Sequence, residues 1–187
     1  MRKTSQKIFI IVLFCILQIS NLQSQISNPQ SSVNNLKSKN PWWVNLGAGP
    51  ALIGSDFGLT AGMTFSYQIK NTVISARMIG MTNINPTAQK IDPSSTKYKM
   101  TDYGILYGAV WTDEEYLFSA GAGIGLVRAA YDNSSIITTN TSISLPLEIQ
   151  IFWRMYDFFG LGFYGHTSFS FEKPLYGLMI SAQLGIW

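Results

Sequence analysis

"SISLPLEIQIFWR", residues 142–154, alternates without interruption between large apolar side chains and a second, mostly polar set. The first set consists of Ile143, Leu145, Leu147, Ile149, Ile151 and Trp153. The second set consists of Ser144, Pro146, Glu148, Gln150, Phe152 and Arg154. Because successive side chains of a β-strand point to opposite faces, this stretch predicts a strand with one continuous apolar face.

The same alternation recurs along the chain, for example in "GLTAGMTFSYQ" (58–68) and "LYGLMISAQLGIW" (175–187). Eight such segments are predicted, at about 42–51, 58–69, 72–82, 98–111, 115–131, 142–154, 158–171 and 175–187. Short connections at 70–71, 112–114 and 155–157 alternate with a second set, which is longer and polar at 83–97 and 132–141 but short near 52–57 and 172–174. The order predicts an all-β chain, an eight-stranded antiparallel up-and-down barrel.

Alternation alone does not distinguish a membrane barrel from a soluble barrel or sandwich. Here the apolar face is aliphatic and aromatic throughout, whereas the opposite face is mostly Gly, Ser, Thr and Gln, and charged residues make up only 12% of the chain. Segments of this length can cross a bilayer at a tilt. Aromatic residues near the short turns form a predicted interfacial girdle: Tyr67, Tyr107, Trp111, Tyr116, Trp153 and Phe159. We therefore expect a transmembrane barrel in the cell outer membrane, with both termini and the short turns on the periplasmic side.

The first 24 residues have the layout of a secretory signal peptide, with a basic start and the apolar run "IFIIVLFCILQI". The alternative is an uncleaved N-terminal anchor. Residues 25–40, "QISNPQSSVNNLKSKN", show no apolar period and are predicted to be a disordered leader, which leaves 41–187 for the barrel. Removing Arg2, Lys3 and Lys7 reduces the thirteen basic residues to ten, equal to the ten acidic ones, so the charge gives no sign of nucleic-acid binding.

Three stretches, "ISLPLEI", "FSAGAGIGLV" and the terminal "QLGIW", resemble the small outer-membrane β-barrel family widespread in Bacteroidetes. The resemblance covers about 42–187 and implies a porin-like barrel of a Gram-negative cell, without a diagnostic catalytic motif. Trp187 departs from the pattern, because it is out of phase with the apolar parity of Ile186. As partners we expect outer-membrane lipid and lipopolysaccharide, together with the barrel-assembly machinery during insertion, and we expect a monomer.

Strand parity directs a set of polar side chains into the lumen: Arg77, Asp102, Glu148, Gln150, His166, Ser168 and Ser170. Arg77 and Glu148 lie at similar distances from their periplasmic turns, and opposite charges in a narrow lumen are expected to pair. An eight-stranded barrel is just wide enough for side chains to fill it. We therefore predict a filled interior, and a narrow pore for small solutes is the alternative.

"HTS", residues 166–168, contains the only histidine of the chain and is similar to the His-x-Ser element of outer-membrane lipid A 3-O-deacylases. That resemblance implies His166 as base, Ser168 as nucleophile and Glu172 as the orienting acid. The chain departs from the family because Phe169 follows the serine and the acid comes only four residues later. Parity also directs His166 and Ser168 inward, away from any acyl chain, although a register slip of one residue would reverse this.

Other chemistry finds little support in the sequence. The glycine-rich "GAGIG" (121–125) and "GLGFYG" (160–165) lie inside alternating segments instead of opening a helix, as a phosphate loop would. A single histidine without clustered partners does not build a metal site. We therefore expect no cofactor, and a non-enzymatic barrel with a structural or surface-interaction role through its extracellular loops. A deacylase-like hydrolase and a narrow pore are the alternatives.

Overall fold

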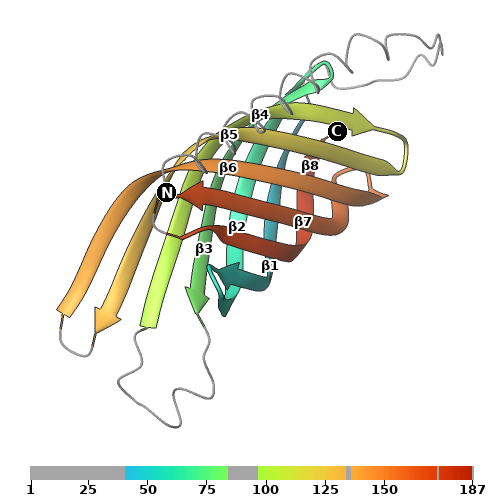
Figure 1. Ribbon diagram of the computed structural model, residues 1–187. Coiled ribbons are helices and arrows are strands. Elements are labelled where there is room, and N and C mark those ends of the chain that lie inside the picture. The colour runs from blue at the N-terminus through green and yellow to red at the C-terminus, as the bar shows by residue number, and fades with distance from the viewer. Residues whose placement is uncertain (1–40, 84–96, 134–135, 172, 187) are drawn as a thin grey trace. The chain divides into compact units, whose positions relative to one another are not determined.

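The computed structural model describes residues 41–83, 97–133, 136–171 and 173–186. The predicted signal peptide and leader, Glu172, Trp187 and most of the predicted loop 83–97 lie outside these residues. The described chain forms eight strands: β1 (Trp42–Ile53), β2 (Asp56–Ile69), β3 (Thr72–Asn83), β4 (Lys97–Thr112), β5 (Tyr116–Asn133), β6 (Ile136–Tyr156), β7 (Phe159–Ser170) and β8 (Leu175–Ile186). Each strand pairs antiparallel with its sequence neighbours, and β8 pairs with β1 to close the barrel (Figure 1). The predicted all-β, eight-stranded antiparallel fold is confirmed.

Alternation in the sequence becomes alternation in exposure. Along β3, for example, Val73, Ser75, Arg77, Ile79 and Met81 are buried inside, while the residues between them face outward. Most outward side chains of the described strands are apolar, and Ile105 and Ile180 are 65% and 70% exposed. Apolar side chains that face water gain no free energy from burial, so a wall of them would be unfavourable in a soluble protein. A continuous apolar band instead matches the hydrocarbon of a bilayer. No helix in the described part of the chain is long and apolar enough to cross a membrane.

One end of the barrel carries the turns at 70–71, 113–115 and 157–158, the first and last residues of the barrel strands, Trp42 and Ile186, and a band of aromatic rings. Four ring pairs lie on its outer surface: Trp42–Phe65, Trp111–Phe118, Tyr116–Trp153 and Tyr156–Phe158, with centroids 5.3–6.4 Å apart. Tyr107 is also exposed there, while Tyr67 and Phe159 are half-buried. Aromatic rings of this kind concentrate at membrane–water interfaces, so these rings form an interfacial girdle where the sequence predicts one. Its position on the periplasmic side stays a prediction.

The opposite end differs from the prediction, because the expected extracellular loop 132–141 is mostly strand. β5 continues to Asn133 and β6 begins at Ile136, so the two strands stay paired through this region. Figure 1 shows β4, β5 and β6 as the longest strands, and they contain 16, 18 and 21 residues. The Ser and Asn residues of "DNSSIITTNT" favour the prediction of a loop. Its Ile and Thr residues, however, are β-branched and favour a β-strand.

Two prolines interrupt the ladders of the barrel. The β1–β8 pairing skips Gly49 and Pro50, and the β5–β6 pairing skips the positions opposite Leu145 and Pro146. Proline has no N–H to donate to a neighbouring strand. The closing seam between the first and last strands is therefore less completely bonded than the ladders without a proline.

Candidate functional site

The predicted lumen residues separate into a central cluster and one residue at the rim. Six are buried inside the barrel: Arg77, Asp102, Glu148, Gln150, His166 and Ser168. Ser170 shares their parity but is half-exposed near the end of β7, where its hydroxyl donates to the Lys173 carbonyl oxygen at 3.1 Å. No metal site of three or more His, Cys, Asp or Glu side chains is found within the described residues.

Arg77 and Asp102 form the ionic centre of the lumen. The Arg77 guanidinium donates to Asp102 Oδ2 from Nε at 3.0 Å and from Nη2 at 2.5 Å, and both side chains are fully buried. Nη1 donates to the Leu147 carbonyl oxygen at 2.9 Å, and Nη2 also lies 3.0 Å from the Thr167 carbonyl oxygen and 2.8 Å from the Ser168 hydroxyl. Burying an unpaired charge costs much free energy, and these acceptors offset that cost for the Arg77 guanidinium.

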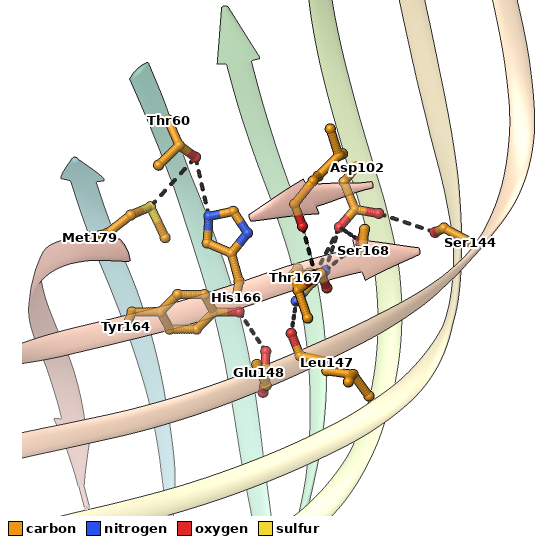
Figure 2. A network of polar contacts seen from close by, with 12 residues as sticks. Thr60, Asp102, Ser144, Leu147, Glu148, Tyr164, His166, Thr167, Ser168 and Met179 are labelled. Carbon is orange, nitrogen blue, oxygen red and sulfur yellow. Dashed lines mark hydrogen bonds and ion pairs between the residues drawn. The ribbon is translucent and has the colours of Figure 1, made fainter. Parts of the chain in front are cut away.

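Ser168 belongs to this ion pair. Its hydroxyl donates to Asp102 Oδ2 at 2.7 Å while it accepts from Arg77. Ser144, on β6, adds a further donor to the other oxygen of Asp102 at 3.3 Å. Figure 2 shows Asp102, Ser144 and Ser168 converging from three strands. The hydroxyl groups complete the hydrogen bonding of a buried carboxylate.

Glu148 does not pair with Arg77, contrary to the sequence-based expectation. Its carboxylate accepts from the Tyr164 hydroxyl at 2.5 Å and from Gln150 Nε2 at 3.0 Å. Gln150 in turn accepts from Asn45 at 2.7 Å and from the Trp43 indole N–H at 3.4 Å. Arg77 and Glu148 lie at similar distances from their turns, but this does not determine the partner of Arg77. Asp102 is on the adjacent strand β4, diagonally across from Arg77, and is therefore the nearer carboxylate.

His166 stands apart from the serine two residues away. Its Nε2 lies 3.3 Å from the Thr60 hydroxyl, and its ring centroid lies 5.9 Å from that of Tyr164 (Figure 2). Nδ1 is buried without a hydrogen-bond partner in the described structure. The imidazole lies against the backbone of Gly177 on β8, where a Cβ atom would overlap it. Packing against glycine fixes the ring inside the barrel.

The described geometry does not bring a base to the serine. Ser168 bonds to the ion pair, whereas His166 bonds to Thr60, and both side chains point into the lumen. An outer-wall groove of about 650 Å³ does reach His166 and Glu148 between β6, β7, β8 and β1, but Ser168 is not among the residues that line it. The third member of the predicted triad, Glu172, lies outside the described residues.

Two apolar clusters fill the lumen above and below the polar layer. The cluster beside the turns at 70–71, 113–115 and 157–158, which we call the periplasmic cluster after the predicted orientation, consists of Trp43, Val73, Val110, Leu117 and Phe152. The cluster toward the opposite end of the barrel consists of Ala51, Ile53, Ile79, Met81, Met100, Val127, Ala129, Tyr164, Leu175 and Met179. Side chains as large as Trp43, Phe152 and Tyr164 are completely buried there. Their bulk occupies the narrow cross-section that eight strands enclose.

Sequence reasoning missed several members of this interior. Thr60, Ser144 and Tyr164 carry hydrogen bonds of the cluster but were not singled out, although their inward parity was readable. The apolar clusters were hidden because both faces of a strand are apolar where they occur, as at Met78 and Ile79 on β3. Alternation gives no signal in such a stretch.

Comparison with solved structures places this arrangement among small membrane barrels. Neisserial surface protein A is 14% identical, with a TM-score of 0.62 over 79% of this chain and 97% of that chain. Ail, the attachment invasion locus protein of Yersinia pestis, is 11% identical, with a TM-score of 0.56 over 80% and 100%. The N-terminal β-barrel domain of Pseudomonas aeruginosa OprF is 9% identical, with a TM-score of 0.54 over 80% and 98%. No family model and no curated protein sequence matches the chain.

The fold is that of the small outer-membrane β-barrels. Identities this low establish the fold alone, and the apolar outer band with its aromatic girdle agrees with it. Together they support the predicted location in the outer membrane.

Proposed function

We propose that this chain is a non-enzymatic outer-membrane barrel whose filled lumen makes it a rigid scaffold for extracellular segments. The observation that carries the proposal is the contrast between its two ends. The interior is closed by a buried ion pair between two apolar clusters, while residues 136–143 of β6, paired with β5, extend past the last residue of β7 as a segment that we call the ribbon. Residues of this ribbon, Thr138 to Thr141, are exposed on both faces. Display of exposed segments on a rigid barrel favours a role in surface interaction.

The topology is tested with single cysteines, since Cys15 in the predicted signal peptide is the only natural one. A maleimide coupled to a polymer too large for the outer membrane should label Thr139→Cys in intact cells. Asp157→Cys, in an exposed short turn, should be labelled only after the membrane is permeabilised. Labelling of Asp157→Cys in intact cells would overturn the orientation, and with it the surface role of the ribbon.

The filled lumen is tested by planar-bilayer recording of the purified barrel. We expect no stable conductance, because Trp43, Phe152 and the Arg77–Asp102 pair obstruct the path. Discrete, reproducible conductance steps would support the narrow-pore alternative instead. Recording Trp43→Ala in parallel is informative, since a rise in conductance in that variant alone assigns the obstruction to the periplasmic cluster.

The deacylase alternative retains one supporting observation, the apolar groove that reaches His166 from the lipid side. Purified barrel incubated with lipopolysaccharide is nevertheless expected to release no fatty acid, because Ser168 is engaged by Arg77 and Asp102. Release that disappears in Ser168→Ala would refute the non-enzymatic proposal.

The finer assignments also belong to this proposal. We propose a barrel of Bacteroidetes type in a Gram-negative cell, exported by a cleaved signal peptide at 1–24, inserted by the barrel-assembly machinery and functioning as a monomer. Outer-membrane lipid and lipopolysaccharide are the proposed partners of its apolar wall, and the groove across β6, β7, β8 and β1 is the proposed place for an acyl chain. N-terminal sequencing of the mature protein tests the signal peptide, because a chain that still begins at Met1 would indicate an anchor.

A further inference from the structure

The extracellular part of β6 is paired on one side only within the described chain. Residues 136–144 pair with β5, but the first pair with β7 is Ser144↔Ser170, at the last residue of β7. No backbone hydrogen bond of residues 137–143 to a described segment outside the β5–β6 ladder is found. Among the described residues, the stretch from 137 to 143 therefore has no strand partner on the side away from β5, and we call it the β6 edge.

The backbone groups that point away from β5 can be identified from the register. The Arg154 N–H donates to the Glu115 carbonyl oxygen, which lies on the β5 side. The β5–β6 pairs keep one constant register from Tyr116↔Trp153 to Asn133↔Ile136, without a bulge. Residues that bond to a given neighbour alternate along an antiparallel strand. Even-numbered residues of the β6 edge therefore bond to β5, and residues 137, 139, 141 and 143 direct N–H and C=O outward.

The β6 edge lacks the features that usually protect an exposed strand. Natural edges are blunted by charged side chains, prolines, bulges or short length. "ITTNTSI", 137–143, has no charged residue and no proline, and its register has no bulge. Five of its seven residues are β-branched, which favours the extended conformation. It is an uncharged template with four residues ready to accept another strand.

A second copy of the chain in the same membrane is a poor fit to this edge. Two barrels inserted the same way are related by an axis along the membrane normal, so their β6 strands run in the same direction across the membrane. Antiparallel pairing needs opposite directions, and the strands of membrane barrels are tilted by only about 35–45° from the barrel axis. An extended segment of a separate polypeptide has no such restriction.

We propose that the β6 edge binds an extended, uncharged segment of another polypeptide by adding it as an antiparallel strand beside residues 137–143. Main-chain hydrogen bonds supply the affinity in such pairing, and alternate side chains supply the selectivity. The β6 edge offers Thr139, Thr141 and Ile143 on one face, which favours β-branched and hydroxyl side chains in the partner. This inference rests on the proposed surface role and names the kind of partner that it serves.

The test uses the full barrel in lipid nanodiscs and the capped peptide ITTNTSI as the probe. The free peptide can pair antiparallel with the same sequence in β6, which places Thr139 opposite Thr141 and Ile137 opposite Ile143. Amide hydrogen exchange followed by NMR should show new protection at residues 139, 141 and 143 on peptide addition. The amides of 138, 140 and 142 should already be protected by β5 and change little.

The discriminating variant is Thr139→Pro combined with Thr141→Pro, which removes two outward N–H groups and leaves the β5 ladder intact. Thr139→Ala combined with Thr141→Ala is the matched control, since it truncates the same side chains and keeps both N–H groups. Peptide affinity should fall about tenfold or more in the proline variant and little in the alanine variant. Retention of the native barrel in both variants is checked by the slower migration of the heat-denatured form on gels.

Equal affinity in both variants, protection at other amides, or no binding to the unmodified barrel would each overturn the strand-addition inference. The labelling of Thr139→Cys in intact cells separates this failure from that of the proposed function. If that cysteine is labelled and the peptide does not bind, the ribbon is displayed and the inference alone is wrong. If it is not labelled, the surface role itself fails.

Discussion

Replacing Asp102 with alanine tests whether the lumen is dry and filled. Asp102 accepts two hydrogen bonds from Arg77 and one each from Ser168 and Ser144, all inside the barrel. In Asp102→Ala the Arg77 guanidinium keeps only neutral acceptors, the carbonyl oxygens of two strands and one hydroxyl. Breaking a buried ion pair from one side costs about 3–5 kcal/mol. We expect a loss of this size in the free energy of unfolding.

The assay is urea-induced unfolding of the barrel in lipid vesicles, followed by tryptophan fluorescence and by gel mobility. Ser119→Ala is the control, because its buried hydroxyl has no hydrogen-bond partner in the described structure and its removal should not lower the free energy of unfolding. The double variant Arg77→Met, Asp102→Leu should recover most of the lost stability, since an apolar pair of similar volume often replaces a buried ion pair without loss.

A small effect would refute this reasoning. Exposed ion pairs contribute about 0–1 kcal/mol, so a loss in that range for Asp102→Ala would mean that water surrounds the pair. The lumen would then be a hydrated path, and the pore alternative would gain support. Failure of the double variant to recover stability would instead show that the hydroxyl and carbonyl contacts of the pair, and not its charge balance, hold the three strands together.

Three further predictions concern other parts of the barrel. Gly177→Val should displace the His166 ring and destabilise the barrel by about 1–3 kcal/mol, the usual effect of overpacking. The same substitution in a His166→Ala background should destabilise it less, and equal losses in both would contradict the packing described. Trp43→Ala should cost about 3–5 kcal/mol in urea unfolding, because it empties the centre of the periplasmic cluster, and a loss below 1 kcal/mol would argue against that cluster as a plug. Ile180→Arg, on the outer wall midway along β8, should lower the free energy of unfolding in vesicles by about 2–4 kcal/mol. Thr139→Arg on the ribbon should change it by less than about 0.5 kcal/mol. Similar values for the two would place Ile180 outside the hydrocarbon.

Strand parity was the part of the structure that sequence could predict well. The order of eight strands, the closed antiparallel barrel and the inward direction of residues such as Arg77 and Ser168 all follow from a period of two. Parity is a local property of the backbone, and it needs no knowledge of neighbours. The short turns and the aromatic residues beside them were readable for the same reason.

Pairing across strands was not predictable in the same way. The choice of Asp102 over Glu148 as the partner of Arg77 depends on the register between β3 and β4, which alternation does not give. The length of β6 was missed because polar composition and strand propensity disagree in "DNSSIITTNT", and pairing with β5 decided the outcome. In both cases the missing information was the register, that is, which residues of the neighbouring strand lie alongside.

The proline in the closing seam has a consequence for the order of events during folding. β1 and β8 lie at the two ends of the barrel sequence, so their pairing closes its largest loop, and closure entropy grows with loop length. The skipped pairs at Gly49 and Pro50 also leave fewer bonds to drive that step. We expect the seam to seal last, after the other seven ladders have formed. Until then the unpaired edges of β1 and β8 face hydrocarbon, which cannot hydrogen-bond to them. This is the stage at which an insertion catalyst would act on the chain.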